Sequence, residues 1–383
     1  MTVQLLTNAR VAGPAGDVRP GWLRTAGERI AAVGHGDAPA DAGVSVRDLG
    51  GRVLAPGFID VHVHGAAGAE FLDAGTEELA AILRLHARGG TTGLLATTVT
   101  ASPERLDAAV RALAAASPVA DGAAILGVHL EGPYLCAKRR GAQDPRHLRA
   151  PDAAELDRLL GSAPVRLMTL APELPGALAA IERLVRAGAV ASVGHTDATY
   201  AQAAAAFDAG ATHATHLFNG MRPFHHREPG VIGAALDRPE VTCELICDGL
   251  HVDPAAMRLA QRLKGSGRTV LVTDAMRAAG LGDGRYRLGH LPVRVRDGRA
   301  ELEGSGTLAG STLTMGAAVR NAVALMGVSL GDAIRMASST PARVLGLQAR
   351  KGALAPGRDA DLVVLDDDLE VSATMIAGRW IGG

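Results

Sequence analysis

The segment FIDVHVHG, residues 58–65, places two histidines at the end of an apolar run that is typical of a buried β-strand. Successive side chains of a strand point to opposite faces, so Asp60, His62 and His64 share one face. Two imidazoles side by side make half of a metal site, because neutral imidazole is a common ligand of Zn²⁺ and similar ions. A pair of hydrogen-bonded core histidines explains this segment alone equally well, so the rest of the chain must decide.

Seven further apolar runs follow the first one, separated mostly by Ala/Leu/Arg-rich segments with helical periodicity. The eight runs cover residues 57–65, 91–100, 124–132, 165–173, 189–197, 211–219, 241–249 and 269–276. They are almost continuously apolar, as expected for parallel strands that are covered on both faces. This alternation predicts the α/β class and a (β/α)₈ TIM-type barrel.

Both ends of the chain have a different pattern, with short β-like runs separated by glycine and proline. We predict that residues 1–54 and 355–383 together form a small β-sandwich domain, and that residues 55–354 form the barrel. The segment 285–311 interrupts the strand–helix alternation, and we expect a β-hairpin insertion there.

Chemically versatile residues stand where the predicted barrel strands end. Active sites of such barrels lie at the carboxyl ends of the strands. The residues found at this end of five different strands are His62, His64, Glu131, His195, His216 and Asp274. Core histidines scattered by chance would not concentrate at strand ends, so the pattern favours a metal site. Nitrogen and carboxylate ligands without thiolates suit Zn²⁺ first, and also Fe²⁺, Mn²⁺ or Co²⁺.

Composition removes several other classes of function. The formal net charge is −1, so a nucleic-acid partner is not expected. Three cysteines without a C-x-x-C spacing argue against a disulfide framework or a cysteine-based zinc site. The N-terminus lacks the pattern of a signal peptide and no apolar stretch is long enough to span a bilayer, so we expect a cytoplasmic protein. The sequence contains no G-x-S-x-G elbow between a strand and a helix, which argues against a serine hydrolase. It contains no G-x-G-x-x-G between a strand and a helix, which argues against a dinucleotide enzyme.

The order of the ligand candidates resembles the amidohydrolase superfamily, with His-x-His after the first strand, histidines after the fifth and sixth, and aspartate after the eighth. Many members carry a carboxylated lysine after the fourth strand, but that strand ends here in TLAPE, without lysine. The motifs HLEGPY, GHTDA, THLFNGM, HHREPG, DGLHVD, LVTDAM and GTLAGS are similar, in this order, to those of the N-acetylglucosamine-6-phosphate deacetylase family. The resemblance covers essentially the whole chain.

This resemblance implies metal-dependent hydrolysis of the acetamide of N-acetyl-D-glucosamine 6-phosphate to D-glucosamine 6-phosphate and acetate, in amino-sugar catabolism or cell-wall recycling. It makes Glu131, His195 and His216 the core metal ligands, with His62 and His64 holding a second ion, so that one or two ions bind per subunit. Asp274 is the expected catalytic residue, which accepts a proton from the attacking water and passes it to the departing amine.

The resemblance also implies a set of substrate-binding residues: Gln143, Asn219, Gly220, Arg227, His251 and Leu308. Arg227 is the candidate for the phosphate, because a guanidinium matches phosphate oxygens in pairs. His251 resembles a family residue that reaches the neighbouring subunit's active site, which implies a homodimer. Gln143 stands where many members have a histidine, so its amide is expected to polarise the acetamide carbonyl with less dependence on pH.

Three alternatives remain open at this point. In the first, the substrate is the galacto epimer, N-acetylgalactosamine 6-phosphate. In the second, the chain is another amidohydrolase. In the third, it is a non-catalytic barrel that serves in an assembly. The last alternative is disfavoured because all six candidate ligands are present.

Overall fold

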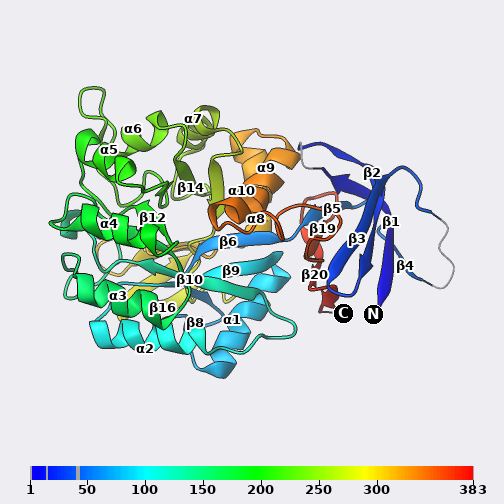
Figure 1. Cartoon of the computed structure of the whole chain (residues 1–383), viewed down its shortest axis with the longest axis horizontal. Helices are drawn as coiled ribbons and strands as arrows, with labels where there is room; N and C mark the ends of the chain where they lie inside the picture. The colour runs from blue at the N-terminus through cyan, green and yellow to red at the C-terminus, as the bar shows by residue number, and fades with distance from the viewer. Residues whose placement is uncertain (1, 14–15, 40–43, 383) are drawn as a thin grey trace.

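The computed structural model describes residues 2–13, 16–39 and 44–382 and shows two parts, a barrel and a smaller sheet beside it (Figure 1). Residues 1, 14–15, 40–43 and 383, which the predicted terminal domain includes, lie outside the described residues. Strand β6 leads from the small sheet directly into the barrel, and both chain ends lie at the small sheet (Figure 1). The exact division into domains stays a prediction.

The larger part is a (β/α)₈ barrel. Its sheet contains eight parallel strands in the spatial order β15-β14-β13-β12-β11-β10-β9-β6. In chain order these are β6 (Phe58–Val63), β9 (Thr91–Thr98), β10 (Ala124–Glu131), β11 (Val165–Leu170), β12 (Val190–Val193), β13 (His213–Ala214), β14 (Thr242–Ile246) and β15 (Thr269–Val272). Each begins inside one of the eight predicted runs.

The first and last strands close the barrel through the residues that carry its chemistry. The N–H of Asp274 donates to the carbonyl of His62 at 2.8 Å. Asp60 is buried on β6 and accepts hydrogen bonds from the N–H and the hydroxyl of Thr273. Burial raises the pKa of Asp60 to about 7, although these donors partly offset the effect. These hydrogen bonds hold the ends of β6 and β15 together and close the barrel.

Helices follow most of the barrel strands and surround them (Figure 1). They are α1 (Thr76–Arg88), α2 (Pro103–Ala114), α3 (Ala153–Ser162), α4 (Ala177–Arg186), α5 (Tyr200–Asp208), α6 (Gly230–Asp237), α7 (Pro254–Lys264), α8 (Met315–Asn321), α9 (Leu330–Ala337) and α10 (Ser339–Val344). Several begin at residues that satisfy free backbone N–H groups: Ser102 caps α2, and Thr199 forms a capping box with Gln202 at α5. No helix in the described part of the chain has both the length and the apolarity needed to cross a bilayer.

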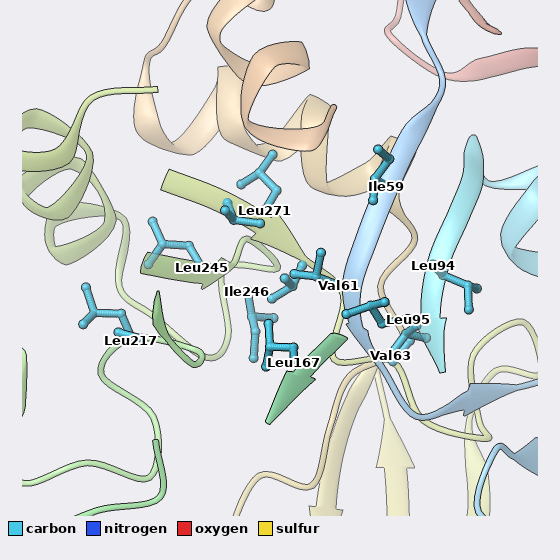
Figure 2. Packing of buried hydrophobic residues seen from close by; sticks show 14 of the residues in the cluster. Ile59, Val61, Val63, Leu94, Leu95, Leu167, Leu217, Leu245, Ile246 and Leu271 are labelled. Carbon is cyan, nitrogen blue, oxygen red and sulfur yellow. The ribbon is translucent and has the colours of Figure 1, made fainter. Parts of the chain in front are cut away.

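Side chains along β6 alternate between the apolar core and the interior of the barrel, where the candidate site lies. Ile59, Val61 and Val63 point into the apolar packing between the strands and their neighbours (Figure 2), and all three are fully buried. Asp60 and His62 point to the other face, the barrel interior, where they meet polar partners. The period of two in FIDVHVHG thus serves packing and chemistry at once.

The small part is one hydrogen-bonded sheet built from both chain ends. Its strands are β1 (Val3–Ala12), β2 (Val18–Ala26), β3 (Arg29–His35), β4 (Ser45–Asp48), β5 (Val53–Pro56), β19 (Leu362–Leu365), β20 (Val371–Ile376) and β21 (Arg379–Ile381). The path runs β21-β20-β19-β5-β1-β2-β3, and β4 pairs with β1 as a branch. Apolar side chains from both ends, such as Leu6, Leu23 and Leu362, share its core.

The segment after the eighth strand has three strands where the sequence suggested a hairpin. They are β16 (Gly284–Leu288), β17 (Leu291–Arg296) and β18 (Arg299–Leu302), an antiparallel meander. Each of its two turns contains a glycine at positive φ, Gly289 and Gly298, which makes both reversals possible.

Candidate active site and metal centre

The six predicted ligands come together at the carboxyl ends of five strands, and each is at most 8% exposed. Two groups suitable for a metal ion form around a common member. One group is Glu131, His195 and His216, and the other is His62, His64 and Glu131. We call them the inner and the outer half-site.

Glu131 connects the two half-sites through its two carboxylate oxygens. Its Oε1 lies 3.0 Å from His195 Nε2 and 3.1 Å from His216 Nε2. Its Oε2 lies 3.3 Å from His64 Nε2. Asp274 Oδ1 is 3.1 Å from the same nitrogen of His64, at the outer half-site. One carboxylate could therefore serve both half-sites, and no lysine follows β11 that could do so instead.

The far nitrogens of the histidines show which nitrogen is free for a metal. Nδ1 of His62 faces Glu244, Nδ1 of His64 faces the carbonyl of Thr97, and Nδ1 of His195 faces the carbonyl of Arg139. Each acceptor requires a proton on Nδ1, which leaves an unprotonated Nε2 directed at the centre. In each half-site the nitrogen and carboxylate oxygen atoms lie within 4.8 Å of one another, and this donor set fits a divalent cation.

The electrostatics of the site lead to the same conclusion. Burial would raise the pKa of the Glu131 carboxyl, but His62 and His195 hold that pKa well below its usual range. Burial would lower the pKa of His64, but Asp274 and Glu131 raise it to about 9. The carboxylates therefore demand positive charge beside them, and a divalent cation supplies it in place of protons on the histidines.

Three ligand residues have backbones in the left-handed region, which non-glycine residues seldom adopt: His195 (φ 47°), His216 (φ 28°) and Asp274 (φ 49°). Such conformations cost on the order of 1–3 kcal/mol each and concentrate at functional sites. Here they turn the side chains off the strand ends and toward the common centre.

A cavity of about 240 Å³ opens onto this centre. Five of the predicted substrate residues line it: Gln143, Asn219, Gly220, His251 and Leu308. Gly220 has φ 58°, and a Cβ at this position would lie 2.8 Å from His195 Nδ1, so a larger residue would displace a ligand. Arg227 is not among the lining residues; it is exposed, with its Nη1 2.8 Å from Nε2 of His226.

His251 is one of the residues that line the cavity of its own chain. Its expected reach to the active site of a neighbouring subunit stays a prediction. Its Nδ1 lies 2.6 Å from Asp248 Oδ2, and Asp248 also accepts from the backbone N–H of His251, which fixes the ring against its own loop. The side chain is almost fully buried there and is not directed outward.

Gln143 has a more definite environment than the sequence suggested. Its Oε1 accepts a hydrogen bond of 2.7 Å from the N–H of Thr100, so its amide nitrogen faces the other way. That nitrogen donates to Oε2 of Glu131 in a short hydrogen bond. Contact with the acetamide carbonyl remains a proposal, whereas the structure shows contact with the carboxylate of Glu131.

Sequence reasoning overlooked several residues around the centre. Leu288 and Thr307 reach the cavity from the meander and the loop after it. Glu244 and His129 lie inside the barrel next to the ligands; burial lowers the pKa of His129 to about 3, so it is neutral there. A signal for Glu244 was present, since it is a lone acid in the apolar run VTCELIC.

Comparison with known proteins identifies the family. The model of the amidohydrolase family matches residues 53–381. The chain belongs to this amidohydrolase family. The family uses divalent metal, which agrees with the His/Glu groups of the two half-sites.

Individual amidohydrolases show how close the relation is. A human protein named N-acetylglucosamine-6-phosphate deacetylase is 44% identical over 88% of this chain and 85% of its own length. An Escherichia coli O157:H7 protein named N-acetylgalactosamine-6-phosphate deacetylase is 43% identical over 94% of this chain and 95% of its own. A mutant N-acetyl-D-glucosamine-6-phosphate deacetylase from Mycobacterium smegmatis, solved in complex with N-acetyl-D-glucosamine-6-phosphate, is 46% identical, covers 100% of both chains and has a TM-score of 0.93.

Proposed function

We propose that this amidohydrolase hydrolyses the acetamide of N-acetyl-D-glucosamine 6-phosphate, releasing acetate and D-glucosamine 6-phosphate. The observation that carries the proposal is the shared carboxylate of Glu131 between two histidine pairs, with Asp274 beside it, in a cavity open to a small substrate. Relatives 42–44% identical over most of the chain bear this activity in their names.

The residues of the site divide the chemistry between them. A bound divalent ion lowers the pKa of a water ligand toward ~7 and polarises the acetamide carbonyl. Burial would raise the pKa of Asp274, but His62 and His64 lower it, so the carboxylate is ionised at neutral pH and ready to accept a proton. Asp274 then returns this proton to the leaving nitrogen, which needs it because an amide anion is a poor leaving group. We propose Zn²⁺ as the ion, with Fe²⁺, Mn²⁺ and Co²⁺ as the alternatives that metal analysis distinguishes.

Phosphate recognition supports a homodimer as part of this proposal. The lining residues of the cavity include His251 but neither lysine nor arginine, as far as the described residues extend. Arg227, the predicted phosphate ligand, stands outside the cavity of its own chain on an exposed loop. A second copy that brings Arg227 to the cavity would complete the phosphate site. The cytoplasmic location stays a prediction from the sequence.

The galacto epimer is the second candidate substrate, because a relative of equal similarity carries that name. The decisive experiment measures acetate release by the purified protein from N-acetylglucosamine 6-phosphate, its galacto epimer and unphosphorylated N-acetylglucosamine, each with and without chelator. Chelator-sensitive release from the first sugar with the highest kcat/KM supports the proposal. A higher kcat/KM for the epimer would reassign the substrate, and equal release from the unphosphorylated sugar would remove the phosphate roles of Arg227 and His251.

A further inference from the structure

Glu244 is a fully buried carboxylate on β14 that does not line the cavity but contacts both half-sites from beneath. Its Oε2 lies 3.0 Å from His62 Nδ1 and accepts a hydrogen bond of 2.9 Å from the backbone N–H of His216. Its Oε1 lies 3.1 Å from Nε2 of His213. A buried charge is costly unless it is paired and hydrogen-bonded, and these contacts provide both conditions.

The proton on each group can be assigned from its neighbours. The hydroxyl of Thr242 donates to the carbonyl of Thr212 at 3.1 Å, so its oxygen is left to accept from Nδ1–H of His213. The other ring nitrogen of His213, Nε2, faces Oε1 of Glu244, so this ring connects Thr242 to Glu244. Glu244 accepts from Nδ1–H of His62 in the same way.

His62 therefore differs from the other ligand histidines. His64 and His195 donate their far N–H to backbone carbonyls, and Nδ1 of His216 is buried without a partner among the described residues. Of these four, His62 alone has a side-chain carboxylate at its far nitrogen, Nδ1, in the described part of the chain. A carboxylate in this position fixes the tautomer of the imidazole and raises its basicity as a ligand.

We propose that Glu244 is a positioning residue that sets the affinity of the outer half-site, His62 with His64, for its own metal ion. It acts through His62, whose Nε2 it directs toward His64 Nε2, 3.3 Å away, and toward Glu131 Oε1, 3.4 Å away. The proposal rests on the metal-binding part of the proposed function. It concerns the second ion, and so it explains how one chain could hold one ion or two.

The variant Glu244→Gln removes the charge while every hydrogen bond can be kept. Its amide oxygen can accept from His62 and His216, as Oε2 does now. Its NH₂ group can donate to Nε2 of His213, whose Nδ1 faces Thr242. Because the side chain is isosteric, no cavity is created, and the variant is expected to fold.

The test measures metal binding without substrate. Metal-free protein is titrated with Zn²⁺ in competition with a chromophoric chelator, for the wild type, Glu244→Gln, His62→Ala and the double variant. We expect two ions in the wild type and an affinity about 10–100-fold lower for one of them in Glu244→Gln. In the His62→Ala background, Glu244→Gln should make no further difference, since the carboxylate acts through that ring.

Glu155→Gln is the matched control, because Glu155 is another buried carboxylate with a charged partner, Arg149, on α3 away from the centre. It should leave both affinities unchanged. The proposal is overturned if the wild type binds one ion only, if Glu244→Gln binds both ions as tightly as the wild type or weakens both equally, if its effect persists without His62, or if the control reproduces it. Acetate release is measured separately, so loss of the proposed activity and loss of the Glu244 role give different results.

Discussion

The amide of Gln143 donates a hydrogen bond to Oε2 of Glu131, the same oxygen that lies 3.3 Å from His64 Nε2. The carboxylate that the two half-sites share is thus held from the loop after β10 as well as by the histidines. Because Oε1 of Gln143 is occupied by the N–H of Thr100, the amide cannot turn around without losing both contacts.

Replacing Gln143 with alanine should lower kcat/KM by about 10–100-fold, because an unsupported ligand of a metal centre typically loses that much. It also leaves the N–H of Thr100 buried without an acceptor, which costs about 1–3 kcal/mol of stability. Steady-state acetate release and urea unfolding measure the two effects. An unchanged kcat/KM would show that Gln143 supports neither the ligand nor the substrate carbonyl.

Asp274→Asn should reduce kcat by about 10²–10⁴-fold with a small change in KM, because an amide cannot carry the proton from water to the leaving amine. Asp73→Asn is the control, since this carboxylate is half exposed and pairs with Arg105 away from the site. Single-turnover acetate release checks the chemical step directly. A parallel loss in the control, or a fall in KM alone, would contradict the role given to Asp274.

Arg227→Ala should raise KM for the 6-phosphate sugar by about 10–100-fold and leave kcat nearly unchanged, since one charged hydrogen bond contributes about 1.5–3 kcal/mol. Activity toward the unphosphorylated sugar should not change. Arg285→Ala, which removes an exposed arginine of the meander, is the matched control. Equal effects on both sugars would refute a phosphate contact.

Removal of metal should lower thermal stability as well as activity. A ligand present at 100–1,000 times its Kd stabilises the folded state by about 3–4 kcal/mol, and chelation removes that contribution. His195→Ala should show a smaller difference between the metal-bound and metal-free forms, whereas the exposed His35→Ala should behave as the wild type. Differential scanning calorimetry with and without chelator makes this comparison, and identical melting of both wild-type forms would contradict a bound ion.

His86 predicts a loss of stability in mild acid. Its ring is buried on α1 and its Nε2 contacts the carbonyl of Gly65 at 3.2 Å; burial lowers its pKa to about 4. The unfolded state therefore binds more protons between pH 6.5 and 4, so stability is present above pH 6.5 and is lost as the pH falls. The loss should approach about 3 kcal/mol at pH 4. His86→Gln keeps a donor for Gly65 and should flatten the pH dependence of urea unfolding; an unchanged slope would rule out His86 as its source.

Strand ends were the least predictable feature of the barrel. The run 211–219 suggested a full strand, but β13 contains only His213–Ala214. His216 and Phe218 have φ of 28° and 81°, so the backbone leaves the sheet in order to aim an imidazole at Glu131. Local β propensity could not predict this turn, because contacts with distant residues decide it.

The sequence pattern also could not predict the buried hydrogen-bond partners of the site residues. Glu244 lies 182 residues from His62 in the chain, and no local period connects them. Gln143 was recognised as a candidate for the substrate, yet its contact with Glu131 depends on how the loop after β10 folds back. The contact of His251 with Asp248 depends in the same way on the path of its own loop.

The sequence alone determined the parts of this protein that have a period or a fixed place in a repeat. Alternating burial and the recurrence of strand and helix identified the barrel, and the ends of parallel strands located His62, His64, Glu131, His195, His216 and Asp274. Only the tertiary structure decided which atoms of these residues contact one another and which carboxylates and carbonyls hydrogen-bond to their far nitrogens. It also decided which loops line the cavity. The physical reason is that periodicity arises from local backbone geometry, whereas hydrogen bonds among buried polar groups are chosen between segments far apart in the chain.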